Sequence, residues 1–132
     1  MKVLALDYGS ARTGVAVSDP SGTLARPVGV VERVRSDAGK ARLLELIRAE
    51  EPERIVVGLP LTLRGTRGEQ ARETERFVEE LRAAVAVPVE TFDERFTTTL
   101  ASRSGGTGAP EDARAAAHLL SGFLEWQSRA SR

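Results

Sequence analysis

The stretch VLALDYGSARTGVAVSD, residues 3–19, decides the fold that the sequence predicts. An apolar run ends on the carboxylate of Asp7, and a second apolar run follows a turn that contains Gly9 and Gly14. Two apolar runs joined by a glycine-containing turn indicate neighbouring antiparallel strands. Charged side chains are rarely buried without a reason, so the acid at the end of the first strand is the first candidate functional residue.

The rest of the chain alternates between strand and helix patterns. Strands are expected at 2–7, 13–18, 26–34, 54–59 and 88–92. Helices are expected from Ser36 or Asp37 to Ala49, at 69–84 and 111–127, with a short helix capped by Thr97 or Thr98. The first three strands form an antiparallel meander, and the last two join it in parallel through right-handed crossovers. The predicted fold class is α/β, a mixed five-stranded sheet with helices on both faces.

Composition limits the function classes. The 132 residues fit one domain, 1–132, and there is no cysteine, which excludes disulfides and thiolate metal sites. The first acid comes too early for a signal peptide and no apolar run could span a bilayer. We therefore expect a cytoplasmic protein with no membrane partner.

The cations are almost all arginine. The formal net charge is zero, so no overall basic field indicates nucleic acid, but only Lys2 and Lys40 of the 19 cations are lysine. Arginine offers a planar fork that suits phosphate, although a compositional habit of the genome explains most of the bias. Five arginines fall in predicted loops or at element ends, where a ligand could meet them: Arg12, Arg64, Arg67, Arg95 and Arg103.

Three acids are expected at one edge of the sheet. Ligands of open sheets bind beyond the carboxyl ends of parallel strands, where Asp7 and Glu94 should lie, and Asp112 opens the last helix. If the three converge, their oxygens could hold Mg²⁺ or Mn²⁺, and a two-metal site could activate water against a phosphodiester. Each acid also has a simpler explanation. Asp7 could only form a turn, and Asp112 could only complement the helix dipole. Glu94 could be a solvated residue at a strand end, with its neighbour Asp93 as the ligand instead.

Four motifs resemble one known family over essentially the whole chain. LALDYGSARTGVAVSD, IVVGLPLTLRGT, VETFDERFTTTLA and EDARAAAHLLSGFL occur in the order and spacing of the YqgF (RuvX) family. That family has the ribonuclease H-like fold and is related to the Holliday-junction resolvase RuvC. The resemblance implies a metal-dependent endonuclease that uses Mg²⁺ or Mn²⁺. It also implies a role in maturing the 5′ end of pre-16S ribosomal RNA, in resolving Holliday junctions, or in both.

The resemblance also assigns residues. It implies that Asp7, Glu94 and Asp112 are the catalytic, metal-binding acids, although the family commonly has a lysine just before the last of them and this chain does not. The family's turn and loop positions, the positions after the second acid and the loop arginines together give the expected nucleic-acid-binding set: Gly9, Arg12, Gly58, Pro60, Arg64, Arg67, Arg95, Thr98 and Arg103.

Two other function classes stay open at this point. A nucleic-acid-binding regulatory protein with the same fold and little catalysis is compatible with the zero net charge and the altered approach to Asp112. A small actin-like or sugar-kinase-like ATPase core could also use an Asp-x-Gly turn, but those proteins duplicate the fold and 132 residues leave no second half. The sequence does not choose between RNA and DNA. Resolution of a symmetric junction would favour a two-fold homodimer.

Overall fold

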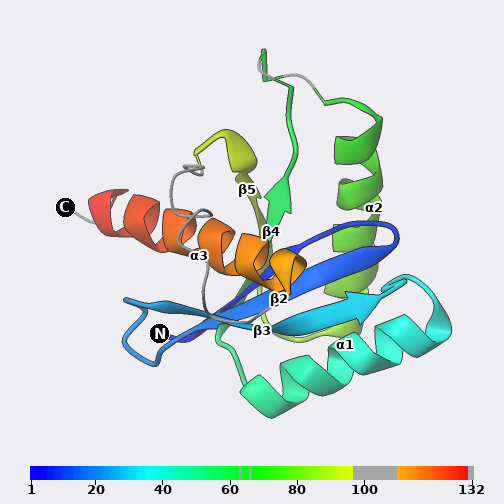
Figure 1. The fold of residues 1–132 in the computed structure, drawn as a ribbon, viewed down its shortest axis with the longest axis horizontal. Helices are drawn as coiled ribbons and strands as arrows, with labels where there is room; N and C mark the ends of the chain where they lie inside the picture. Colours follow the sequence, from blue (N-terminus) through cyan, green and yellow to red (C-terminus); the bar gives the residue numbers. More distant parts are fainter. Residues whose placement is uncertain (63, 66, 97–109, 131–132) are drawn as a thin grey trace.

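The computed structural model describes residues 1–62, 64–65, 67–96 and 110–130. Its centre is one five-stranded sheet with the strand order β3-β2-β1-β4-β5. Figure 1 shows this sheet between the helices. The strands are β1 (Val3–Asp7), β2 (Arg12–Ser18), β3 (Ala25–Glu32), β4 (Arg54–Leu59) and β5 (Val89–Asp93). The first three are antiparallel, and β4 and β5 run parallel to β1, so the predicted mixed sheet is confirmed.

The register brings three strand ends to the same edge. Leu6 of β1 is paired with Val57 of β4, and Leu59 of β4 is paired with Asp93 of β5. Because the three strands are parallel, the residues that follow them emerge on the same side of the sheet. This edge, formed by the carboxyl ends of β1, β4 and β5, is called the carboxyl edge below.

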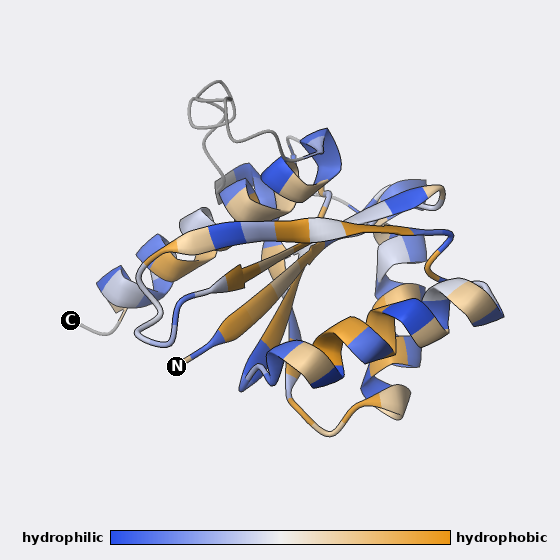
Figure 2. Ribbon diagram, turned by 60° about the horizontal axis from the view of Figure 1, so that its bottom comes forward, coloured by the Kyte–Doolittle hydropathy of each residue, from blue (hydrophilic) through white to orange (hydrophobic). Residues whose placement is uncertain are grey.

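Helices cover both faces of the sheet, and Figure 2 shows hydrophobic residues along the strands between them. On one face, Leu4 and Leu6 of β1 belong to a buried cluster with α1 (Asp37–Glu50) and α2 (Glu69–Ala84). On the other face, Val3 and Ala5 belong to a cluster with α3 (Glu111–Ala130). Strand β1 is therefore buried from both sides and gives the acid at its end a rigid support.

Two local predictions need correction or restriction. Strand β3 ends at Glu32 rather than at residue 34, because Arg33 adopts a left-handed conformation with φ 45° and donates its backbone N–H to Ala11. The chain then enters α1, where the Ser36 side chain accepts a hydrogen bond from Gly39 N at 3.0 Å. The short helix expected after Thr97 lies outside the described residues.

A short 3-10 helix that the sequence analysis did not predict, η1 (Glu94–Phe96), directly follows β5. No helix in the described part of the chain is long and apolar enough to cross a membrane.

Candidate active site

Asp7 lies at the carboxyl edge on the α3 side of the sheet. It is the last residue of β1 and is paired with Gly14 of β2. Side chains alternate along a strand, and Val3 and Ala5 pack beneath α3, so Asp7 faces the same way. Its side chain is half-buried, which is a position that a carboxylate rarely occupies without a partner.

Glu94 meets Asp7 from the other side of β4. Glu94 is the first residue after β5, and its carboxyl group lies within hydrogen-bonding reach of the Asp7 carboxyl group. Gly58 of β4 makes room for it: a Cβ at Gly58 would lie 2.6 Å from Glu94 Oε1 and 3.0 Å from Leu119 Cδ2. The absence of a side chain at Gly58 thus allows the Glu94 carboxylate to lie over the sheet between the strand ends.

The two acids perturb each other. Burial raises the pKa of Asp7 above its ordinary value, and the negative charge of Asp112 adds to the rise. Burial also raises the pKa of Glu94, to about 7, and the charge of Asp7 and the hydrogen bond with Asp7 contribute. A hydrogen bond between two carboxyl groups requires a proton, so the pair is arranged to hold either a proton or a cation.

Asp112 lies nearby but has a different partner. It is in the first turn of α3, whose start packs on β2 at Gly14, where a Cβ would overlap the Asp112 carbonyl group. The side chain of Asp112 forms an ion pair with Arg12, with Nε 3.2 Å from Oδ2. Among the described residues, no group of three or more His, Asp or Glu side chains is close enough to hold a metal ion. The structure therefore joins two of the three predicted acids and pairs the third with an arginine.

The predicted glycine positions of the nucleic-acid-binding set have structural roles. A Cβ at Gly9 would lie 2.5 Å from the Arg12 carbonyl oxygen, so glycine allows the tight β1–β2 turn to close. Gly58 accommodates Glu94, and Pro60 is the residue after β4. Whether nucleic acid also approaches these backbones stays a prediction.

The predicted arginines differ in what they already contact. The side chain of Arg12 is 66% exposed although it pairs with Asp112. Arg64 is exposed, and Arg67 forms an ion pair with Glu75, with Nε 2.9 Å from Oε2. The guanidinium of Arg95 is hydrogen-bonded to Asp93, and this bonding lowers the pKa of the Asp93 carboxyl. Thr98 and Arg103 lie outside the described residues.

Sequence reasoning missed a support on the opposite face of the sheet. Tyr8 directly follows Asp7 and points to the α1 and α2 side, where its hydroxyl donates to Glu73 Oε2 at 2.9 Å. Its ring stacks on Phe77 with centroids 4.7 Å apart. These contacts attach the end of β1 to α2 and so fix the backbone that carries Asp7. The strand alternation around Asp7 was the available signal, because the next residue must face the other layer.

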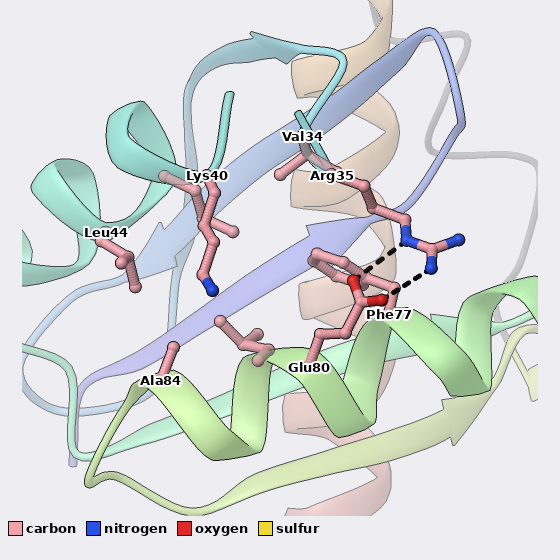
Figure 3. Close-up of a pocket in the computed structure, with 9 residues that line it drawn as sticks. Val34, Arg35, Lys40, Leu44, Phe77, Glu80 and Ala84 are labelled. Atoms are coloured by element: carbon pink, nitrogen blue, oxygen red, sulfur yellow. Dashed lines mark hydrogen bonds and ion pairs between the residues drawn. The ribbon is translucent and has the colours of Figure 1, made fainter. Parts of the chain in front are cut away.

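The same side of the sheet contains a small hollow between α1 and α2. Figure 3 shows its apolar wall, which includes Val34, Leu44 and Phe77, and the pair of hydrogen bonds between Arg35 and Glu80. Arg35 Nε is 3.0 Å from Glu80 Oε1, and Nη2 is 2.6 Å from Oε2. The sheet separates this hollow from the acids, so it takes no part in the candidate site.

Comparisons with known proteins agree with this architecture. Residues 1–126 match the RuvX family, which is described as Holliday junction resolvase. A relative from Anaeromyxobacter sp. (strain Fw109-5), named "Putative pre-16S rRNA nuclease", is 42% identical, and the match covers 95% of this chain and 97% of the relative. A relative of the same name from Chloroflexus aurantiacus is also 42% identical, over 76% of this chain, but the match covers only 66% of that protein.

Solved structures show the same fold. Thermus thermophilus RuvC in complex with a Holliday junction substrate superposes with a TM-score of 0.62 at 20% identity, covering 97% of this chain and 96% of that one. The Fowlpox virus resolvase in complex with Holliday junction DNA superposes with a TM-score of 0.52 at 9% identity, covering 99% and 98% of the two chains. The predicted ribonuclease H-like, RuvC-related arrangement of sheet and helices is confirmed at the level of the fold.

Proposed function

This chain belongs to the RuvX family, and from that premise we propose that it is a metal-dependent endonuclease that hydrolyses phosphodiester bonds in nucleic acid. The names of its relatives favour pre-16S ribosomal RNA as the substrate, and the description of the family adds branched DNA. The observation that carries the proposal is the half-buried pair of Asp7 and Glu94 at the carboxyl edge.

The residues present fit a hard divalent cation. Two carboxyl groups lie close together in a partly desolvated site that raises the pKa of both, and carboxylate oxygens are the ligands that Mg²⁺ and Mn²⁺ prefer. Asp7 and Glu94 would hold the ion, and Asp112 would join them by leaving Arg12. One or two bound ions would supply an activated water and offset the charge that develops on the phosphate.

The protein's own groups would bind and orient the nucleic acid. Released from Asp112, the exposed guanidinium of Arg12 could contact a phosphate beside the acids. Arg64 and Arg67 lie in the segment between β4 and α2, which projects beyond the carboxyl edge in Figure 1. We retain Thr98 and Arg103 as further contacts on sequence grounds, and a homodimer as the assembly that would match a two-fold symmetric junction.

Cleavage assays with a matched acid variant test this function. The substrates are a 5′-extended 16S precursor RNA and a four-way DNA junction, each with Mg²⁺, Mn²⁺, Ca²⁺ or excess EDTA. We expect cleavage with Mg²⁺ or Mn²⁺, binding with little turnover in Ca²⁺, and a loss of several orders of magnitude in Asp7→Asn. Asp37→Asn, at an exposed acid that begins α1, is the control and should cleave like the parent.

Two results would contradict the proposal. Full activity in EDTA would exclude a metal mechanism, and full activity of Asp7→Asn would leave Asp7 as a turn former only. If the parent binds RNA or junction DNA but cleaves neither with any of the cations, the regulatory binding protein becomes the better interpretation.

A further inference from the structure

The two residues that flank Glu94 bind each other. Asp93 is the last residue of β5 and Arg95 is the second residue of η1. Arg95 Nε lies 3.0 Å from Asp93 Oδ1 and 2.9 Å from Oδ2, and Nη2 lies 2.6 Å from Oδ2. The backbone N–H of Arg95 also donates to Asp93 Oδ1 at 2.9 Å. Both carboxylate oxygens of Asp93 are therefore occupied, and the chain turns sharply with Glu94 between the two partners.

The contact between Asp93 and Arg95 directs the Glu94 side chain toward Asp7. Phe92 packs against Phe123 beneath α3, so Asp93, the next residue of the strand, points to the opposite face of the sheet. An acid on that face cannot reach Asp7 on the α3 face. The turn closed by Asp93 and Arg95 then brings the Glu94 side chain back over Gly58.

The same guanidinium contacts the segment between β4 and α2. A Cβ at Gly65 would lie 3.2 Å from Arg95 Nη1 and 3.3 Å from Nη2, so the flat guanidinium lies directly against this glycine. Gly65 has a φ of +80° and donates its N–H to Thr62 O at 2.8 Å, which closes a turn next to Arg64. Arg95 thus connects the turn that carries Glu94 to the segment that carries the exposed arginine.

We propose that Asp93 and Arg95 are positioning residues, a clamp that orients Glu94 and holds the Gly65 turn at the carboxyl edge. Asp93 is then not a metal ligand, and Arg95 acts through its planar fork rather than as a charge on phosphate. Only an arginine can bind both Asp93 oxygens while its guanidinium also lies against Gly65; lysine keeps the charge but has no fork. The catalytic consequence rests on the proposed nuclease function, whereas the structural consequence does not.

Arg95→Lys is the deciding variant, with Asp93→Asn as its partner and Arg129→Lys as the matched control. Arg129 pairs with Glu125 on α3, with Nη2 2.7 Å from Oε1, and its side chain is 75% exposed, so this substitution likewise weakens an arginine–carboxylate pair but does so away from the carboxyl edge. For each variant, the amide hydrogen exchange of Arg95 and Gly65 is measured by NMR. The same preparations are assayed for Mn²⁺ affinity by calorimetry, for the salt dependence of binding to a four-way DNA junction, and for cleavage.

The clamp predicts one pattern across these measurements. Arg95→Lys and Asp93→Asn should both speed the exchange of the Gly65 amide, although Gly65 is distant from both in sequence. Cleavage should fall on the order of tenfold or more in both, because small displacements of a catalytic group are costly. Asp93→Asn should still bind Mn²⁺, and neither variant should change the slope of log K against log [salt].

Three outcomes would overturn the clamp. Unchanged Gly65 exchange in Arg95→Lys would show that no mechanical link exists, whatever the activity. Parental cleavage by Arg95→Lys, with a salt slope lowered by about one in Arg95→Gln, would make Arg95 a phosphate contact. Loss of Mn²⁺ binding in Asp93→Asn as severe as in Asp7→Asn would make Asp93 a ligand. If the parent cleaves nothing while the exchange pattern holds, the nuclease function fails and the clamp stands.

Discussion

Asp7→Asn should stabilise the metal-free protein at high pH and not at low pH. Asparagine keeps the shape of the side chain and removes its charge, so it ends the repulsion that ionised Asp7 exerts on Glu94. The folded protein raises the pKa of Glu94 from 4.5 to about 7, so the folded chain binds more protons than the unfolded chain between these values. The metal-free parent should therefore lose stability as the pH rises from about 4.5 through 7.

The size of the effect follows from that shift. A pKa shift from 4.5 to about 7 would lower the free energy of unfolding at high pH by about 3 kcal/mol. Solvent screens a partly exposed group, so the expected loss is about 1–2 kcal/mol. Burial is the largest cause of the shift and remains in the variant, and only the contribution of the Asp7 charge is removed. We therefore expect Asp7→Asn to raise the free energy of unfolding at high pH by about 1 kcal/mol. For a chain of this length, that raises Tm by roughly 3–5 °C.

Thermal melts of the parent and Asp7→Asn in EDTA at pH 8 and pH 5 measure this Tm difference. The gain should be present at pH 8, where both acids would ionise, and should vanish at pH 5, where Glu94 is protonated. Asp37→Asn, at an exposed acid on α1, should show no such difference between the two pH values. Added Mn²⁺ should then stabilise the parent far more than Asp7→Asn, because a cation stabilises only the fold that binds it. An equal Tm change at both pH values, or a loss at pH 8, would refute this account of the acid pair.

Three further substitutions test the surroundings of the pair. Gly58→Ala places a Cβ 2.6 Å from Glu94 Oε1, so it should displace that carboxylate and lower Mn²⁺ affinity in calorimetry at least tenfold while the protein stays folded. Tyr8→Phe keeps the ring stacking and removes the hydroxyl hydrogen bond, and denaturant unfolding should show a loss of about 1 kcal/mol. Arg12→Ala should weaken binding to junction DNA and lower its salt slope by about one, whereas Arg129→Ala should leave the slope unchanged.

The topology was predictable because the pattern of apolar residues in each strand indicates how that strand is buried. Strand β4 reads as a continuously apolar run, which indicates burial on both faces, and the antiparallel meander follows from short turns between apolar runs. Once β1, β4 and β5 are known to be parallel, the sequence places Asp7 and Glu94 at the same edge. Their proximity was therefore open to sequence reasoning, because it depends on strand direction and not on side-chain packing.

The partner of each charge was not predictable in the same way. The ion pair of Arg12 with Asp112 joins a hairpin to the start of the last helix, and its formation depends on how closely α3 approaches β2. That approach is set by a single missing side chain at Gly14. Likewise, the sequence presents Asp93 and Arg95 as two further candidates for ligand and phosphate contact, and only the turn around Glu94 shows that they satisfy each other.

The candidate site thus depends on two places where a side chain is missing. Gly14 lets the first turn of α3 pack directly on β2, which brings Asp112 near Asp7, and Gly58 lets Glu94 lie over β4. Neither glycine is in a left-handed conformation, so the requirement comes from space and not from backbone strain. At Gly58 the obstructing atoms belong to side chains, whereas at Gly14 they belong to the backbone of α3. A Cβ at Gly58 can therefore be accommodated by moving one carboxylate, but a Cβ at Gly14 must move the helix, and with it the cluster that α3 forms on β1.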